Sequence, residues 1–510
     1  MTRPAHRRGS RALRTLAGRM GILPDFVDVL GRRRRTSDAT RETLLAAMGC
    51  PAASDAEARA ILERLDDSER ERVLAPVQVV RGNIPATLAL SAQPGATSYE
   101  LEVIEETGIV HRSGGALRGR GARVPFPSTL RTGLPPGYHR VRVRLGGDHA
   151  WHAEQLLIVA PLRCAPPRRG EGRRNRRFGL TVNLWTVSSA RNWGAGDFTD
   201  LAELAEWAGA YGAAFIGVNP LYALRCRRGE ESPYNPLTRL FRNPLYLDVT
   251  AVPEFAESAE ARQLVVSPAF RTALDRVRDA ATVDHVAVMT LKRDVLRALF
   301  RTFCSRHAGR ETPRDLAYRR YLAERGSLLD DFATFLALEE HFGMSAWPAW
   351  PDAFHDPRGQ AARAFRAERA EAVDFHRWVQ FELDRQLATA AGRAAAGGVA
   401  NGFVGDLPVG TAAASSDAWA FPGLFARGVH IGAPPDEYAR EGQDWGLAPL
   451  DPHRLRADRH AYWTLVVRAA LAHKGALRVD HVMGLLRQYW IPAGRPAAEG
   501  AYVRYPADDL

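Results

Sequence analysis

The sequence predicts an α/β fold based on a (β/α)8 barrel, of which only about the first four strands are present, with a long helical insertion. From Phe178 onward, short apolar strand-like runs alternate with helical stripes, which is typical of a parallel sheet. Polar residues follow these runs directly, as at Asn219, Asp406 and Asp480. Barrel active sites lie at the carboxyl ends of the strands. A doubly wound sheet binds ligands at the same edge and remains an alternative.

Two smaller units are expected before the barrel. Residues 1–72 form an N-terminal helical segment, in which Ser37 and Ser54 stand where helix N-caps are expected. Residues 73–160 consist of short alternating strands divided by turns, which predicts a small β-sandwich. Residues 161–177 are rich in proline, arginine and glycine, so we expect an exposed basic linker there.

The barrel unit is expected to occupy residues 178–510. Its strands are identified by their apolar runs and its helices by apolar residues at helical spacing. The insertion, at about 250–400, is largely helical in pattern and separates the second strand from the third. The predicted elements are strands at 178–185, 214–219, 402–406 and 476–480, with helices at 201–211 and 459–473.

Composition and charge exclude several classes of protein. The 510 residues are 46% hydrophobic, and no run of about 18 apolar residues occurs that could cross a membrane. Four cysteines lie far apart, which argues against a zinc site or a disulfide framework and for a reducing cytoplasm. The net charge is +11, but the densest arginine runs, at 32–35 and 168–177, lack interleaved aromatic residues. We therefore expect no membrane and no specific nucleic acid as partner.

The stretch 475–490 is the most informative, because Arg478 and Asp480 stand in an apolar run. Side chains alternate along a strand, so these two charges share one face. Opposite charges on a buried strand are costly unless they serve a purpose. A neighbouring guanidinium lowers the pKa of a carboxyl group, and a nucleophilic aspartate must be ionised. A structural ion pair on an edge strand is the alternative.

Two loops present side chains suited to a sugar. The segment 232–236, Ser-Pro-Tyr-Asn-Pro, is made rigid by its prolines and presents Tyr234, which can stack on a sugar ring. The segment 442–446 offers Gln443 and Trp445 on a flexible loop. The alternatives are a surface loop anchored by a buried tyrosine and a loop with a buried tryptophan.

Three polar residues near strand ends have a functional and a structural interpretation. Asp406 stands on a constrained turn before Pro408, which favours a functional role. His481 can hydrogen-bond a substrate hydroxyl, although a histidine satisfied by the backbone is also expected. Asp197 precedes a helical stripe and is expected to be a helix N-cap rather than a catalytic group.

Motifs that would indicate a metal or a cofactor are missing from the sequence. It contains no phosphate-binding Gly-Lys-Ser/Thr loop, no His-Glu-x-x-His and no nucleophile-elbow serine. We therefore predict no metal and no cofactor.

In combination, several segments resemble the 4-alpha-glucanotransferases of the amylomaltase type, in the alpha-amylase clan. The resemblance spans most of residues 178–510, and the N-terminal helices and sandwich resemble the extension of one bacterial subgroup. It rests on the order and spacing of motifs beginning at Asn192 (NWGAGDF), Ser232 (SPY), Arg239 (RLFRNPLY), Gly405 (GDLP), Gly442 (GQDWG), Arg478 (RVDH) and Glu499 (EGAYVRYP).

The resemblance implies a site and a reaction. Asp480 takes the nucleophile position and Arg478 supports it. The substrate-binding positions are Ser232, Tyr234, Asp406, Gln443, Trp445 and His481. The expected substrates are α-1,4-glucans, namely maltooligosaccharides and starch or glycogen chains. The reaction is a retaining double displacement that passes a glucan segment to the 4-hydroxyl of an acceptor.

The family's general acid, a glutamate after the fifth strand, and a second aspartate at the seventh lie beyond the reach of the resemblance, because the sequence stops at Leu510. We therefore expect the front part of a longer enzyme, inactive and poorly stable alone because a half barrel exposes an edge and an apolar face. An amylase-like hydrolase and a non-catalytic glucan-binding remnant are the alternative functions.

Overall fold

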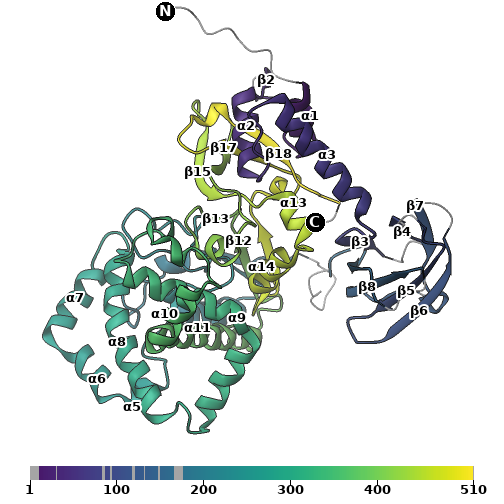
Figure 1. The fold of residues 1–510 in the computed structure, drawn as a ribbon. Coiled ribbons are helices and arrows are strands. Elements are labelled where there is room, and N and C mark those ends of the chain that lie inside the picture. The colour runs from purple at the N-terminus through teal and green to yellow at the C-terminus, as the bar shows by residue number, and fades with distance from the viewer. Residues whose placement is uncertain are drawn as a thin grey trace, which may run out of the picture.

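A computed structural model describes residues 11–29, 31–82, 87–91, 95–117, 121–130, 133–146, 150–165 and 176–508. They form an N-terminal group of helices, a β-sandwich, a parallel sheet with a large helical insertion, and an antiparallel sheet (Figure 1). No helix within these ranges is long and apolar enough to cross a membrane. All four cysteines are free thiols.

The N-terminal helices lie against the antiparallel sheet formed near the other end of the chain (Figure 1). The elements are α1 (Arg11–Arg19), β1 (Asp25–Val27), β2 (Arg33–Arg35), α2 (Asp38–Ala47) and α3 (Asp55–Glu71). Leu16 and Leu44 share a buried cluster with Trp490 of the sheet. Ser37 and Ser54 cap α2 and α3, which confirms both predicted caps. The helices and the antiparallel sheet therefore form one continuous core.

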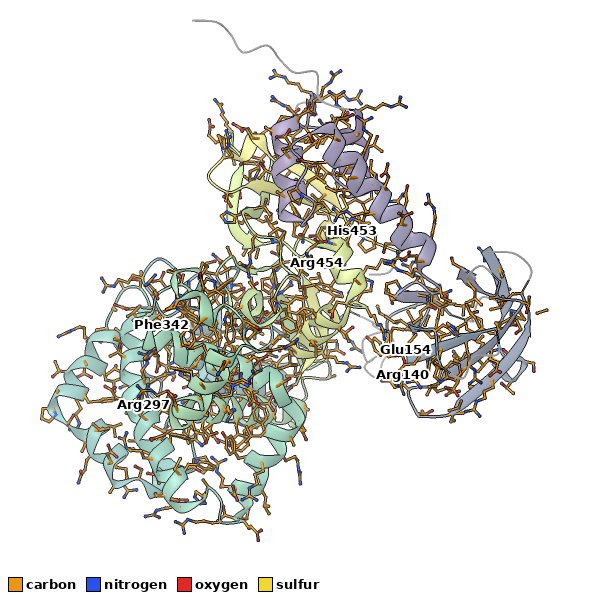
Figure 2. The ribbon with its side chains drawn as sticks, viewed as in Figure 1. Arg140, Glu154, Arg297, Phe342, His453 and Arg454 are labelled. Atoms are coloured by element: carbon orange, nitrogen blue, oxygen red, sulfur yellow. The ribbon has the colours of Figure 1, made fainter. Side chains whose placement is uncertain are left out.

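The sandwich consists of two sheets, with strand orders β3-β9-β8-β5-β6 and β4-β7. Its strands are β3 (Val77–Arg81), β4 (Thr87–Ser91), β5 (Ser98–Ile104), β6 (Val110–Ala116), β7 (Gly121–Pro125), β8 (Gly137–Leu145) and β9 (Ala153–Ala160). Glu154 lies on the side of the sandwich that faces the rest of the molecule (Figure 2), where it accepts a hydrogen bond of 3.1 Å from Arg459. Residues 166–175, most of the predicted linker, lie outside the described residues.

A four-stranded parallel sheet, in the order β10-β11-β12-β16, carries the strands predicted for the barrel. They are β10 (Leu180–Val182), β11 (Ile216–Val218), β12 (Phe403–Leu407) and β16 (Ala476–Val479), with α4 (Phe198–Ala210) after β10 and α14 (Ala461–Leu471) before β16. Asp197 is the N-cap of α4 and forms a capping box with Asp200, so its predicted structural role is confirmed. Ile216 and Phe403 belong to the main buried cluster, so one face of the sheet packs against the core.

The insertion between β11 and β12 is helical, as its pattern predicted (Figure 1). Its helices are α5 (Glu254–Glu257), α6 (Ala259–Val266), α7 (Pro268–Arg278), α8 (His285–Arg306), α9 (Pro313–His341), α10 (Gln360–Glu368) and α11 (Ala370–Ala396). Trp350 and Trp378 are buried in the cluster that the insertion shares with α4 and β12. The insertion therefore completes the core behind the parallel sheet.

The sequence did not predict the five-stranded antiparallel sheet, whose order is β13-β15-β14-β17-β18. Its strands are β13 (Thr411–Ala412), β14 (Val429–Ala433), β15 (Gln443–Ala448), β17 (Arg487–Pro492) and β18 (Ala501–Arg504), and short helices α12 (Ser416–Ala420) and α13 (Pro452–Ala457) lie between them in the chain. The prediction of a flexible loop at 442–446 is therefore wrong, because pairing with β14 makes this segment the start of a strand.

Candidate active site

The carboxyl ends of the parallel strands bring polar residues into one row. Asp406 on β12 stands opposite Arg478 on β16 in the register of the sheet. Asn183 and Asn219 directly follow β10 and β11, which pair in register up to Val182 and Val218. A hollow of about 340 Å³ is lined by these four polar residues. The row therefore forms the polar wall of a cavity at the sheet edge where parallel-sheet enzymes carry out chemistry.

Hydrogen bonds connect Tyr234, Asp406, Arg478 and Asp480 in a line. The Tyr234 hydroxyl donates to Oδ2 of Asp406 at 2.9 Å. Arg478 donates from Nη1 to Oδ1 of Asp406 and from Nη2 to Oδ1 of Asp480, both at 2.6 Å. Its hydrogen bond to Asp406 is the main reason why the pKa of Arg478 is raised above the usual value. The guanidinium therefore stays charged while it holds both carboxylates.

The strand that carries Arg478 is more exposed than the sequence suggested. We expected the pair on a buried strand, but the Arg478 side chain is 55% exposed and that of Asp480 is 26% exposed. The reason is that β16 lies at one edge of the described sheet, next to β12 alone. The predicted pairing of Arg478 with Asp480 itself is confirmed.

His481, Trp445 and Gln443 form a second group of contacting side chains next to Asp480. His481 follows Asp480 in a left-handed backbone conformation, with φ of 48°. Its ring lies edge-on to Trp445, with centroids 5.2 Å apart, and the indole Nε1 of Trp445 donates to Oε1 of Gln443 at 2.9 Å. Burial lowers the pKa of His481, so the imidazole is neutral near pH 7.

A β-bulge brings Trp445 to this place. The pairing of β14 with β15 shifts between Ile431 and Gly432, whose partners are Leu447 and Asp444, so Trp445 and Gly446 are extra residues on β15. Gly446 has a φ of +65°, which glycine adopts without strain. Bulges often redirect a side chain beside an active site. Here the bulge gives Trp445 its contact with His481.

Ser232 belongs to the turn that presents Tyr234 and is not part of the line. Its Oγ accepts a hydrogen bond of 3.4 Å from the backbone N–H of Tyr234. Tyr234 is 42% exposed, so the alternative of a loop anchored by a buried tyrosine is wrong and the ring is accessible. Burial of part of the side chain, and next its bond to Asp406, raise the pKa of Tyr234, which keeps the phenol protonated.

Two positioning residues were not predicted as site residues. Arg239 is buried, and its Nη1 donates to the carbonyl of Val409 at 3.0 Å, just after the strand that carries Asp406. Asn219 accepts from the N–H of Leu184 at 2.7 Å and donates to the hydroxyl of Tyr246 at 2.9 Å. Arg239 opens one of the recognised motifs and Asn219 stands at a predicted strand end, and these were the signals available. The contacts of both residues depend on the fold.

The chemistry of the site is that of carboxylates, one guanidinium, a phenol, an imidazole and an indole. No group of three or more histidine, cysteine, aspartate or glutamate residues that could hold a metal occurs in the part of the chain that the structure describes. Such a set of hydrogen-bonding groups around an aromatic ring suits a polyhydroxyl ligand that reacts at a carboxylate.

Comparison with known proteins decides the family. A family model described as 4-alpha-glucanotransferase matches residues 182–510, about two thirds of the chain and all of the site. The chain belongs to the 4-alpha-glucanotransferase family. A second model, the MalQ N-terminal beta sandwich domain, matches residues 73–161. The family resemblance inferred from the motifs is thereby confirmed, and glucan transfer is favoured over hydrolysis and over binding without catalysis.

Individual relatives agree with this assignment. The 4-alpha-glucanotransferase of Mycobacterium tuberculosis (strain ATCC 25618 / H37Rv) is 37% identical, over 97% of this chain and 68% of that protein. That of Haemophilus influenzae is 32% identical, over 74% of this chain and 54% of that protein. The crystal structure of amylomaltase from Corynebacterium glutamicum matches with a TM-score of 0.81 and 27% identity, over 98% of this chain and 69% of that one. The protein described here therefore has an α/β glycosidase-type fold and acts on α-glucans.

Proposed function

We propose that this 4-alpha-glucanotransferase transfers α-1,4-glucan segments by a retaining double displacement in which Asp480 is the nucleophile. The bonding of the two carboxylates supports the choice of Asp480. Both oxygens of Asp406 accept hydrogen bonds, one from Arg478 and one from Tyr234. In Asp480, by contrast, Oδ1 accepts a hydrogen bond from Arg478, and Oδ2 has no hydrogen-bond partner among the described residues. Oδ2 of Asp480 is therefore free to form a bond with carbon.

In the first step, Oδ2 of Asp480 attacks the anomeric carbon of the donor glucan. The bond from that carbon to the glycosidic oxygen breaks, and the leaving oxygen takes a proton from a general acid. Retaining enzymes place the two carboxyl groups about 5–5.5 Å apart.

In the second step, the 4-hydroxyl of an acceptor glucan attacks the same carbon and breaks the ester to Asp480. Its proton returns to the conjugate base of the acid, so the enzyme is restored. Transfer exceeds hydrolysis when the acceptor is bound well and water is restricted. Tyr234, which bonds Asp406, and Trp445, which contacts His481, are our candidates for stacking on the sugar rings.

Each remaining predicted site residue receives a role in this proposal. Arg478 orients Asp480 and Asp406 and offsets part of their combined negative charge. Asp406 accepts hydrogen bonds from glucose hydroxyls, Gln443 accepts or donates them, and the neutral His481 is a further hydrogen-bonding partner. Ser232 shapes the turn under Tyr234.

We also propose that the parallel sheet is the wall of a (β/α)8 barrel. The order β10-β11-β12-β16 follows the order of the strands in the chain. A doubly wound sheet reverses its strand order at a switch point, and such a reversal does not occur among the described strands. The chain order supports a barrel.

Product analysis with an activated donor tests the proposed function. Maltotriosyl fluoride loses fluoride without protonation, so formation of the ester to Asp480 from it does not depend on a general acid. With maltose as acceptor we expect chains longer than three glucose units. Asp480→Asn should abolish them, whereas Asp67→Asn, at an exposed carboxylate of α3 that pairs with Arg70, should keep most of the activity. Release of maltotriose without any longer chain would contradict transfer and favour a hydrolase.

A further inference from the structure

Arg239 is a buried cation with no part in the reaction steps above. It lies in the loop that presents Tyr234, and only 1% of it is exposed. Its Nη1 donates to the carbonyls of Pro408 and Val409, at 3.3 Å and 3.0 Å. Burial of a guanidinium is costly, so a charge held in this way is expected to serve a purpose.

A second set of contacts fixes Arg239 in place. Its backbone N–H donates to Oδ2 of Asp417 on α12 at 2.9 Å, and the hydroxyl of Tyr462 on α14 donates to the same oxygen at 2.7 Å. The guanidinium lies over the rings of Tyr462 and Trp463, 5.8 Å and 5.6 Å from their centroids, which stabilises its charge. Arg239, Asp417 and Tyr462 therefore form one connected buried group, which we call the Arg239 unit.

The backbone that Arg239 holds is connected to both carboxylates. Asp406 immediately precedes Leu407 on β12, and the two carbonyls that accept from Arg239 follow Leu407 directly. The carbonyl of Leu407 accepts a hydrogen bond of 3.0 Å from the backbone N–H of Asp480. The segment 406–409 is thus bonded at one end to the backbone of the nucleophile and at the other to Arg239.

The Arg239 unit and the nucleophile also border the same cavity. Its volume is about 40 Å³, and its lining includes Arg239, Trp463, Asp480 and His481. Among the described residues, Arg239 has no hydrogen bond to the side chain of Asp406 or of Asp480; its guanidinium bonds backbone carbonyls instead. Arg239 therefore acts on the carboxylates through the backbone and not by direct contact.

We propose that Arg239 is a positioning residue for glucan transfer, which fixes Asp406 and the backbone of Asp480 relative to each other by holding the segment 406–409. The proposal rests on the proposed function, in which Asp480 is the nucleophile. The bonds from Arg478 to both carboxylates require this spacing. Without Arg239 the segment loses two hydrogen bonds and can shift, and a shift of about 1 Å near a reacting group can cost about 100-fold in rate.

Hydrogen exchange at the amide of Asp480, followed by mass spectrometry, tests the proposal without catalysis. Arg239→Met keeps the length of the side chain and removes both donors. We expect exchange at Asp480 to become at least about tenfold faster, because the carbonyl that protects this amide is no longer held. The control is Arg41→Met, at a buried arginine of α2 that donates to the carbonyl of Pro24 at 3.3 Å. It should lower stability and leave exchange at Asp480 unchanged.

The rate of ester formation is a second test. Fluoride released in the first turnover of a fluorinated maltosyl fluoride measures attack by Asp480, and calorimetric titration with maltotriose in an Asp480→Asn background measures binding. We expect Arg239→Met to lower the rate constant about 100-fold and to weaken maltotriose at most about fivefold. Arg239→Lys keeps a cation that can bond one of the two carbonyls, so its rate should be intermediate. Arg41→Met should react at the parent rate.

The proposal is overturned if Arg239→Met exchanges at Asp480 as slowly as the parent protein, or forms the ester as fast. If Arg239→Met fails to fold, Arg239→Lys takes its place, with exchange at least about threefold faster expected and parent values overturning the proposal. A parent protein that forms no ester contradicts the role of Asp480 as nucleophile, whereas exchange still decides the role of Arg239. The two failures are therefore distinguishable.

Discussion

Arg478 is the residue on which the arrangement of both carboxylates depends. It bonds Asp406 and Asp480 at the same time, at 2.6 Å each. A lysine at this position has one charged nitrogen without a planar fork, so it cannot reproduce both bonds in the same geometry. The exposed guanidinium contributes little to stability, because ion pairs that are open to water are screened.

We expect Arg478→Lys to lower kcat at least about 100-fold, in the range found for the loss of one preorganised electrostatic contact. The melting temperature should stay close to that of the parent protein. Transfer from maltotriosyl fluoride and thermal unfolding measure the two effects. Arg495→Lys, at another exposed arginine, is the control and should change neither. Unchanged kcat in Arg478→Lys would remove Arg478 from the proposed mechanism.

His481 gives a prediction about pH and stability. Burial lowers its pKa in the folded state, so between that pKa and the unfolded value of about 6.5 the unfolded chain binds more protons. Stability from this residue is therefore lost as pH falls through about 6.5. His481→Gln should reduce the fall in melting temperature between pH 7.5 and pH 5.5. An equal fall in both proteins would show that His481 is not responsible.

At the scale of elements, the bulge in β15 determines where Trp445 lies. Gly446 and Gly494 both have positive φ, +65° and +75°, and a Cβ on either glycine would meet no atom within 4 Å. Alanine at either position should therefore cost the same backbone strain, about 1–2 kcal/mol. Only Gly446→Ala should also lower transfer activity, because it shifts the bulge and the contact of Trp445 with His481. Equal activity in both variants would contradict a role for the bulge.

The loop from β10 to α4 is held by a buried ion network. Arg191 bonds Asp197, Asp200 and Asp248 at 2.6–2.9 Å, and all three carboxylates are buried. Arg191→Met would leave these charges without their partner and should cost about 3–5 kcal/mol. Arg228→Met breaks an exposed pair with Asp284 and should cost at most about 1 kcal/mol. Urea unfolding compares the two, and similar losses would show that the network contributes little.

The sequence predicted local features of the site better than distant ones. Arg478 and Asp480 were placed together because alternation along a strand is a local rule. The bond between Tyr234 and Asp406 joins residues 172 positions apart, so only the fold brings them together. The segment 442–446 was mistaken for a loop, because two glycines indicate a turn, whereas pairing with the distant strand β14 makes it a bulged strand. Burial of β16 was also misjudged, because exposure depends on the neighbours of the whole sheet.

At the scale of the whole molecule, an apolar surface follows the last parallel strand. Val482, Met483 and Leu486 are 51–62% exposed and lie just beyond β16, at one edge of the described sheet. Contiguous exposed apolar side chains favour association. We expect concentration-dependent self-association in light scattering, and Val482→Lys/Leu486→Lys should reduce it. A parent protein that stays monomeric up to high concentration would contradict this expectation.

The central claim is that Asp480 forms the covalent bond to the sugar. The most direct measurement is to trap that bond with a fluorinated maltosyl fluoride, which forms the ester quickly and releases it slowly, and to identify the labelled peptide by mass spectrometry. We predict a single glycosylated residue, Asp480, and no label in Asp480→Asn. A label on Asp406 or on any other residue would contradict the account.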